Sequence, residues 1–353
     1  MRPARALIDL SALRHNYRLA RERHGGRALA VVKANAYGHG AVQCACALEA
    51  EADGFAVAFL EEALTLRAAG IRRPILLLEG VFEASELADV VREELWIVVH
   101  HEAQLRMLET TALAAPVHVW LKINTGMNRA GFLPEAASAA WQRLHASGKV
   151  ADITLMTHFA RADEPQVITT TEQVARFDAA TAALPGARSL ANSGAILGWP
   201  QARRDWARPG ILLYGADPLP QEGNGLKPVM TLESAVMAVR EIAPGEALGY
   251  GGRFVADAPT RVGLVAMGYA DGYPRGVPDG TPVSLEGHPS RIIGRVSMDM
   301  LTVDLSGLPA SAIGSRVELW GREVPVNRVA AAAGTIAYEL LCNVKRVPFS
   351  YQG

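Results

Sequence analysis

Short apolar runs and helical stretches alternate along the first 215 residues of the chain. The first run, at residues 28–33, is rich in valine and predicts a fully buried strand. A smaller candidate strand at residues 7–10 precedes it and leads into a helix whose expected N-cap is Ser11. The buried runs lie at residues 28–33, 54–58, 74–78, 95–99, 117–123, 153–157, 188–191 and 211–214.

This alternation predicts parallel strands joined by helical crossovers. Eight strand-then-helix units favour a closed (β/α)8 barrel over an open, doubly wound sheet. No Gly-x-Gly-x-x-Gly motif follows the first strand, which also argues against a dinucleotide-binding fold. We therefore expect an α/β protein with an N-terminal TIM-type barrel over residues 1–220. The first residues of the chain, up to about residue 10, can pair with the domain that follows.

The pattern changes near residue 216. Residues 216–228 are rich in proline, glycine and polar side chains and are typical of a linker. Short alternating or β-branched runs follow, separated by turn residues, so residues 221–353 are predicted to form a mostly-β domain. These runs lie at residues 233–242, 261–267, 281–285, 292–303 and 316–319, and two short helices are expected near 326–333 and 336–342.

Composition excludes several classes of protein. The chain has 353 residues, half of them hydrophobic, which suits two domains with sizeable cores. Its formal net charge of -1 is spread without a basic stripe, so nucleic acid is not an expected partner. No run is long enough to span a bilayer and no signal peptide is visible, which predicts a cytoplasmic protein. Cys44, Cys46 and Cys342 fit neither a disulfide framework nor a zinc site, and no metal is expected.

Unusual polar residues stand where the predicted barrel strands stop. The active site of such a barrel lies at the carboxyl ends of its strands, so these residues are expected to share one site. Each one alone has a structural explanation: Lys33 can extend to solvent, His158 can be a packed histidine and Gly210 can be a plain turn. The set consists of Lys33, Lys122 and His158 at the ends of the first, fifth and sixth strands, Asn192 and Ser193 after the seventh, and Arg208 to Gly210 entering the eighth.

Two features of this set point to particular chemistry. A lysine at the end of a buried strand is a natural imine-forming nucleophile, which favours Lys33 as a reacting amine. Ser193 begins a short helix and Gly210 lets a backbone amide approach closely, an arrangement that suits phosphate. Tyr37 can add a hydroxyl group from the loop after the first strand.

Several motifs in both predicted domains resemble those of the alanine racemases, which are pyridoxal-phosphate enzymes. The first is VVKANAYGHG at residues 31–40. The others are KINTGMNRAGF (122–132), THFARADE (157–164), ANSGA (191–195), RPGILLYG (208–215), GYGGRF (249–254), GYADGYPR (268–275) and GRVSMDM (294–300). The resemblance implies racemisation of alanine by a homodimer that binds pyridoxal phosphate.

The resemblance also implies roles for single residues. Lys33 is the expected covalent partner of the cofactor and one catalytic base, and Tyr250 is the second base. The expected cofactor ligands are Tyr37, Ser193, Gly210 and Ile211 at the phosphate, Arg208 at the pyridine nitrogen, His158 beside the ring, and Asn192. The expected substrate residues are Arg129, Tyr269 and Met298, with Tyr250, Tyr269 and Met298 donated by the partner subunit, and Lys122 occupies a position that is often carbamylated.

One position departs from the pattern, and other functions remain open. Some members carry a phosphate-binding tyrosine before Arg-Val-Pro near the C-terminus, where this chain has Lys345. A broad-specificity amino-acid racemase on the same fold, a non-catalytic carrier of pyridoxal phosphate and a decarboxylase of the same architecture are alternatives. The second domain, which carries Tyr250, argues against the carrier.

Overall fold

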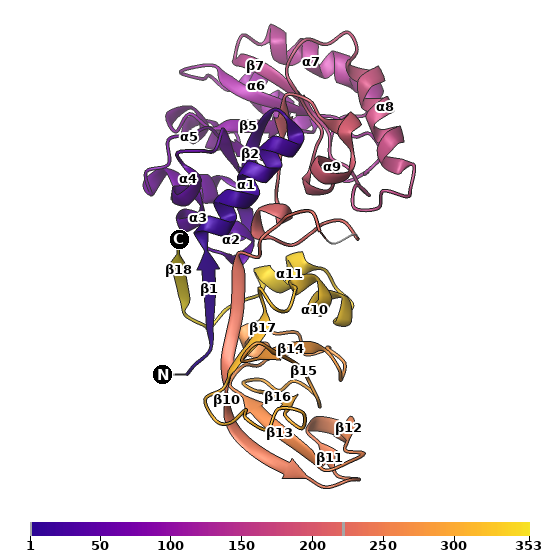
Figure 1. Ribbon diagram of the computed structural model, residues 1–353. Coiled ribbons are helices and arrows are strands. Elements are labelled where there is room, and N and C mark those ends of the chain that lie inside the picture. Colours follow the sequence, from indigo (N-terminus) through magenta and orange to yellow (C-terminus); the bar gives the residue numbers. More distant parts are fainter. Residues whose placement is uncertain (1, 221–222) are drawn as a thin grey trace.

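The computed structural model describes residues 2–220 and 223–353. The chain forms a barrel with helices around it and a separate β domain, and the long strand β10 (Met230–Ile242) leads from one into the other (Figure 1). Within the described residues, no helix combines the length and the apolar character that a membrane span requires. The three cysteines are unpaired.

Eight parallel strands form the barrel, as the alternating pattern predicts. They are β2 (Arg27–Val31), β3 (Gly54–Val57), β4 (Ile75–Leu77), β5 (Trp96–Val99), β6 (Val117–Lys122), β7 (Val150–Met156), β8 (Arg188–Ser189) and β9 (Trp206–Ala207). Their order is β8-β7-β6-β5-β4-β3-β2-β9, and β2 pairs in parallel with β9. A hydrogen bond of 2.9 Å from Arg208 N to Ala191 O links the segments that follow β8 and β9. The barrel is therefore nearly closed.

Helices cover the outside of the barrel, because each strand is buried on both faces and each helix buries one apolar side. They are α1 (Leu10–His24), α3 (Ala41–Leu48), α4 (Leu60–Ala68), α5 (Glu86–Arg92), α6 (Glu102–Thr110), α7 (Ala137–Ala146), α8 (Thr169–Thr181) and α9 (Ser193–Gly198). The N-cap of α1 is Asp9, whose carboxylate accepts a hydrogen bond from Ala12 N at 3.0 Å. The prediction of Ser11 is wrong, because the ionised carboxylate two residues earlier takes the capping role.

The predicted eighth strand is also wrong. Residues Ile211–Tyr214 form a 3₁₀ helix, η3, closed by a hydrogen bond from Leu213 N to Gly210 O at 2.9 Å. The eighth strand is β9, just before it in the chain. All four residues of η3 are buried, and a short buried run has the same apolar pattern in a strand and in a helix. Consequently Arg208 follows the last strand, at the carboxyl end of the barrel.

The second domain is mostly β, as predicted. Its main sheet runs β15-β14-β17-β10-β1-β18, and β13 and β16 extend it from β10. Strand β1 (Arg5–Asp9) pairs antiparallel with β10 and parallel with β18, so both chain ends join this sheet. The remaining elements are β11 (Ala247–Leu248), β12 (Phe254–Val255), β13 (Thr260–Val265), β14 (Pro282–Leu285), β15 (His288–Arg291), β16 (Leu301–Asp304), β17 (Arg316–Trp320), β18 (Phe349–Gln352), α10 (Val326–Ala332) and α11 (Ala337–Cys342).

The predicted strand at residues 292–303 is much shorter in the structure. Only Leu301–Asp304 form β16, and Gly294, with a φ of 76°, interrupts the extended chain before it. Besides the short β11–β12 pair, strands β15 and β18 are additions to the prediction. The first contains Pro289 at the edge of the sheet, and the second gains its partner from the opposite end of the chain.

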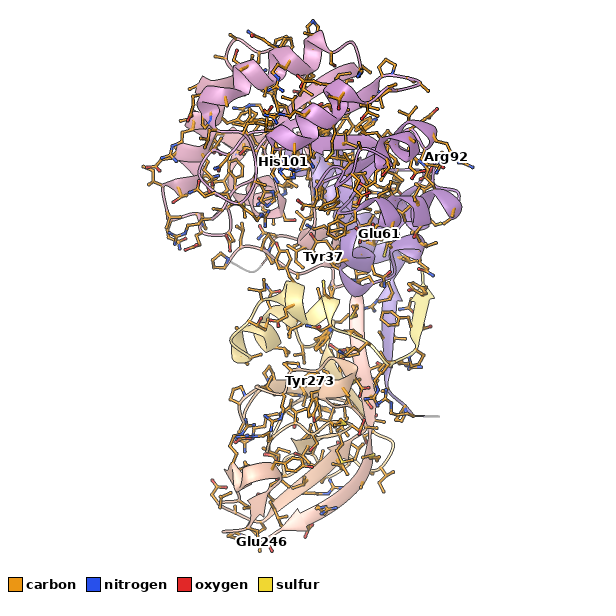
Figure 2. The ribbon with its side chains drawn as sticks, turned by 180° about the vertical axis from the view of Figure 1, so that it is seen from behind. Tyr37, Glu61, Arg92, His101, Glu246 and Tyr273 are labelled. Carbon is orange, nitrogen blue, oxygen red and sulfur yellow. The ribbon has the colours of Figure 1, made fainter. Side chains whose placement is uncertain are left out.

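The β domain contacts the barrel through α11. A Cβ atom on Gly38 would lie only 2.1 Å from Leu341 O, so the loop after β2 packs directly on this helix. Figure 2 shows Tyr37 on the barrel side of this junction, and Glu246 at the end of the β domain farthest from the barrel. Glu246 immediately precedes β11. The β domain therefore places α11 at the barrel mouth and the β11–β12 hairpin far from it.

Candidate active site

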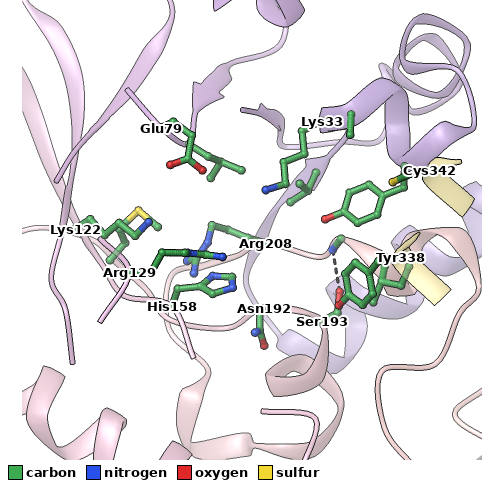
Figure 3. Close-up of a pocket in the computed structure, with 17 residues that line it drawn as sticks. Lys33, Glu79, Lys122, Arg129, His158, Asn192, Ser193, Arg208, Tyr338 and Cys342 are labelled. Atoms are coloured by element: carbon green, nitrogen blue, oxygen red, sulfur yellow. Dashed lines mark hydrogen bonds between the residues drawn. The ribbon is translucent and has the colours of Figure 1, made fainter. Parts of the chain in front are cut away.

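The polar strand ends meet in one cavity of about 350 Å³ at the mouth of the barrel (Figure 3). Among the residues with expected roles, those from the barrel all line this cavity. They are Lys33, Tyr37, Lys122, Arg129, His158, Asn192, Ser193, Arg208, Gly210 and Ile211. The prediction that polar residues at strand ends share one site is therefore confirmed for Lys33, Lys122, His158, Asn192 and Ser193. Arg208 joins them from the end of β9, not from the start of the predicted strand at residues 211–214.

Lys33 enters the cavity from an unusual turn. The residue begins α2 (Lys33–Gly38), in which Ala34 to Tyr37 all have left-handed backbone angles, with φ between 51° and 54°. Each such conformation costs an L-residue roughly 1–2 kcal/mol, so the surrounding structure must impose it. Asn35 fixes the far end of the turn, where its backbone O accepts from Gly40 N at 3.0 Å and its Oδ1 accepts from Ala41 N at 2.9 Å. The turn aims the Lys33 amine into the cavity (Figure 3).

Hydroxyl groups and a glycine amide converge at one end of the cavity. Ser193 Oγ accepts hydrogen bonds from Gly210 N at 2.9 Å and from Leu212 N at 3.4 Å. A Cβ atom on Gly210 would lie 2.6 Å from the hydroxyl oxygen of Tyr37, so any larger residue would fill this space. Tyr338 of α11 completes the group, with its ring 5.8 Å from that of Tyr37. Burial raises the pKa of Tyr338 to about 12, so its hydroxyl stays protonated and can donate.

Arg208 is a buried cation on the opposite wall. Only 4% of the residue is exposed, and its guanidinium donates to Ser189 O at 2.9 Å, to Thr157 O at 2.6 Å and to the Ser189 hydroxyl. All of these acceptors are neutral oxygens. Burial lowers the pKa of Arg208 to about 10, which still leaves it charged at neutral pH. A buried charge held this way is costly to stability, which indicates a functional reason for it.

The neighbouring ionisable groups are pushed toward their neutral forms. Burial, reinforced by the charges of Arg208 and Arg129, holds the pKa of His158 well below its usual range, so its imidazole is neutral. Lys122 is only 6% exposed, and burial lowers its pKa to about 8 although Glu79 acts in the opposite direction. About half of the Lys122 side chains therefore carry no charge at pH 8.

The cavity as a whole is positively charged. Four basic residues line it, namely Lys33, Lys122, Arg129 and Arg208, against the single carboxylate of Glu79. Such a concentration of positive charge attracts anions. The donors at Gly210 and Ser193 suit a phosphate in particular, because phosphate oxygens accept hydrogen bonds from backbone amides and hydroxyls.

Among the residues with polar side chains that line the cavity, sequence reasoning missed three: Glu79, Tyr338 and Cys342. Glu79 directly follows the predicted strand at residues 74–78, so the strand-end rule could have found it. Tyr338 and Cys342 come from α11 of the other domain, and no local signal announces this contact. Lys345 does not line the cavity, and its backbone amide bonds to Asp271 O at 3.0 Å. Tyr338, seven residues earlier in the chain, lines the cavity instead.

The expected residues of the β domain lie elsewhere. Tyr250 stands between β11 and β12, at the end of the domain far from the barrel, and is 67% exposed. Tyr269 and Met298 are 36% and 53% exposed, and their segments are joined by a hydrogen bond from Tyr269 N to Ser297 O at 3.0 Å. None of the three lines the cavity of its own chain.

The fold and the cavity define a two-domain enzyme of the barrel class, with an amine and an anion-binding cradle at its mouth. Comparison with known proteins gives the family. Residues 8–218 match the family model "Alanine racemase, N-terminal domain", and residues 229–351 match "Alanine racemase, C-terminal domain". The chain therefore belongs to the alanine racemase family and is an isomerase.

Individual relatives agree over the whole chain. The alanine racemase of Azoarcus sp. (strain BH72) is 74% identical over 353 residues, which is all of both chains. The crystal structure of the biosynthetic alanine racemase from Pseudomonas aeruginosa is 48% identical, covers all of both chains and has a TM-score of 0.97. An alanine racemase structure from Bartonella henselae with covalently bound pyridoxal phosphate is 31% identical over 99% of both chains, with a TM-score of 0.90. The decarboxylase and carrier alternatives are set aside by this membership.

Proposed function

We propose that the protein interconverts L-alanine and D-alanine with pyridoxal phosphate bound in the barrel cavity. The observation that carries the proposal is the Lys33 amine, held in a cavity that also contains the phosphate cradle and the buried Arg208 cation. The test is to purify the protein with pyridoxal phosphate and to follow D-alanine formed from L-alanine on a chiral column. The same assay with other amino acids decides between an alanine racemase and one of broad specificity.

The residues present fit the cofactor. Tyr37, Ser193, Tyr338 and the amides of Gly210 and Ile211 would hold its phosphate, and Lys33 would bind it covalently. His158 would lie beside the ring with Asn192 near it, although Asn192 Oδ1 already caps α9 by accepting from Ala195 N at 3.1 Å. When bound, the cofactor supplies the electron sink that makes the α-proton of an amino acid removable.

Arg208 would face the pyridine nitrogen. Because its guanidinium stays charged at neutral pH, it disfavours a second positive charge on that nitrogen. The bonds to Ser189 O and Thr157 O keep it from moving away. We expect this contact to weaken the electron sink and so to limit side reactions such as transamination.

Racemisation requires a proton carrier on each face of the α-carbon. Lys33 Nζ takes the proton on one face, and the hydroxyl of Tyr250 returns one on the other, with the roles reversed in the opposite direction. Arg129 binds the substrate carboxylate, and Tyr269 and Met298 limit the space for the side chain. The residues Tyr250, Tyr269 and Met298 come from the partner subunit of a homodimer.

The surface of a single chain supports this dimer. Tyr250, Met298 and Met300 are large side chains of the β domain that a single chain leaves exposed, as expected where a partner subunit binds. A second cavity of about 840 Å³ continues from Lys33 across the ends of β3, β4 and β5, and Phe59 and Phe82 line it. Alanine is too small to fill this space, so there is room for a segment of the partner.

Replacing Gly210 with alanine tests the phosphate cradle. The added Cβ would lie 2.6 Å from the Tyr37 hydroxyl and push it away from the amide of residue 210. Losing one hydrogen bond to a charged group predicts an affinity for pyridoxal phosphate at least about tenfold weaker. The measurement is a visible-absorbance titration of the apoprotein.

Gly198→Ala is the matched control for this change. Its Cβ would meet Leu219 at 3.5 Å, an ordinary contact, in the same helix that begins at Ser193. Equal affinities for the two variants would mean that the phosphate does not bind at Gly210.

Carbamylation of Lys122 would turn its cation into an anion able to orient Arg129. The neutral amine attacks CO2 and releases one proton, so a pKa of about 8 makes the modification rise steeply between pH 6 and 8 at constant CO2 pressure. An ordinary lysine would need a pH more than two units higher for the same neutral fraction. We expect a ¹³C carbamate resonance that grows over this interval and disappears in Lys122→Gln. A spectrum without a Lys122-dependent resonance at any pH would show that the lysine stays unmodified.

A further inference from the structure

The carboxylate of Glu62 connects the ends of the first two barrel strands. Glu62 lies in the first turn of α4, and its Oε1 accepts a hydrogen bond of 2.6 Å from the amide of Ala34. Its Oε2 accepts from Ala58 N at 2.8 Å and from Phe59 N at 3.3 Å, just beyond the end of β3. One side chain thus joins the residue next to Lys33 to the neighbouring strand.

The two ends of the left-handed turn are held in different ways. At its far end, His39 Nδ1 lies 3.0 Å from both Ala36 O and Tyr37 O, and Gly38 packs on Leu341 O. At the lysine end, Ala34 is exposed and its amide is bonded to Glu62. The far end is therefore held by local hydrogen bonds and by packing on α11. At the lysine end, Val32 O accepts from Ala36 N at 2.8 Å, and the exposed amide of Ala34 is bonded to a charged side chain.

Helix capping does not explain this arrangement. A glutamate in the first turn commonly accepts hydrogen bonds from the amides that enter its own helix, as Glu62 does with Phe59 N. Glu86 does the same for α5, where its Oε2 accepts from Phe82 N at 2.6 Å and from Glu83 N at 3.3 Å. Glu62 differs from Glu86 in also accepting a hydrogen bond from Ala34 N, outside its own helix. Ala34 belongs to a strained turn, which requires support from other parts of the structure.

We propose that Glu62 is a positioning residue for Lys33. Its carboxylate accepts a hydrogen bond from Ala34 N and so holds the first left-handed residue of the turn. The amine of Lys33 therefore keeps the same position when it binds the cofactor and when it carries a proton. The inference rests on the proposed function, in which Lys33 is the reacting amine. Glu62 touches no reacting atom and acts through the backbone of Lys33. Because a displacement of about 1 Å can reduce a rate on the order of 100-fold, this bond matters for turnover.

Hydrogen exchange of the holoenzyme tests the inference directly. In Glu62→Ala the amide of Ala34 loses its acceptor, so exchange in the peptide covering residues 33–38 is expected to accelerate at least about tenfold. In the control Glu86→Ala, faster exchange is confined to the peptide with residues 82–83. Faster exchange at residues 58–59 of Glu62→Ala, with residues 33–38 unchanged, would reduce Glu62 to a helix cap and overturn the inference.

Kinetics supply the second measurement. Glu62→Ala is expected to lower kcat at least about tenfold with KM for alanine changed less than about twofold, because the amine is misplaced while the substrate contacts remain. Glu62→Gln keeps one acceptor oxygen and is expected to recover part of the lost kcat. If Glu62→Ala does not fold, Glu62→Gln is measured in its place. Covalent capture of pyridoxal phosphate by the apoprotein, trapped with borohydride at Lys33, slows in parallel.

The outcomes separate this inference from the proposed function. If kcat of Glu62→Ala matches that of the wild-type protein, Glu62 does not position Lys33, and the proposed function stands. If the wild-type protein itself fails to racemise alanine, the proposed function fails, and the exchange experiment still decides whether Glu62 holds the turn.

Discussion

Replacing Lys33 with alanine is expected to give a folded protein that holds no covalent cofactor and no longer racemises alanine. The change removes both the amine that binds pyridoxal phosphate and one of the two proton carriers. General acid–base groups contribute on the order of 10²–10⁴-fold alone, so the rate should fall by at least about 10³-fold. The measurements are the rate of D-alanine formation and peptide mass spectrometry after borohydride reduction, which locates the trapped cofactor.

Two further lysines make the result of this experiment specific. Lys149 precedes β7 at the opposite end of the barrel and bonds Glu109 O at 2.7 Å, so Lys149→Ala is a control with the same change of charge. Lys122 lines the same cavity as Lys33 and is partly neutral near pH 8. If the trapped cofactor of the wild-type protein were found on Lys122, the assignment of Lys33 would be wrong.

Much of the barrel site can be predicted from the sequence because position in a parallel sheet dictates position in space. Carboxyl ends of parallel strands share one edge, so a lysine at the end of residues 28–33 and a histidine after residues 153–157 are brought together without any knowledge of side-chain contacts. The same rule also places Glu79, which follows the third run. It requires only that the strands are recognised in their correct order.

Local conformation is harder to predict than placement. The run at residues 211–214 is as apolar as a strand, yet it forms η3, because burial alone does not distinguish the two states. Ala34 to Tyr37 adopt a left-handed turn without a glycine among them, and of the four only Asn35 is a residue type that favours this conformation. The turn is imposed from outside by contacts such as the one from Glu62, which lies 28 residues further along the chain.

Contacts between distant segments of the chain are also difficult to predict from the sequence. Tyr338 reaches the cavity because α11 packs on the loop after β2, a contact that no pattern in either segment announces. Tyr250 presents the opposite case. Its motif resembles that of a catalytic residue, but its own chain places it at the far end of the β domain, 67% exposed. This placement supports the proposal that Tyr250 serves the cavity of another chain.

Mixing two inactive variants is therefore expected to restore activity. In a homodimer with shared sites, one cavity takes Lys33 from the first chain and Tyr250 from the second. A heterodimer of Lys33→Ala and Tyr250→Phe chains thus contains one cavity with both residues intact and one with neither. Random pairing gives half heterodimers, each with one of two sites restored, so the co-expressed mixture should recover about a quarter of the wild-type activity.

The control for this experiment pairs each single variant with the double variant Lys33→Ala/Tyr250→Phe. No pairing of these chains rebuilds an intact cavity, so these mixtures should stay inactive although the chains associate in the same way. If Tyr250 instead acted on the Lys33 of its own chain, the heterodimer of single variants would also lack an intact site. Absence of restored activity in heterodimers, purified through two different affinity tags, would therefore reject the shared active site.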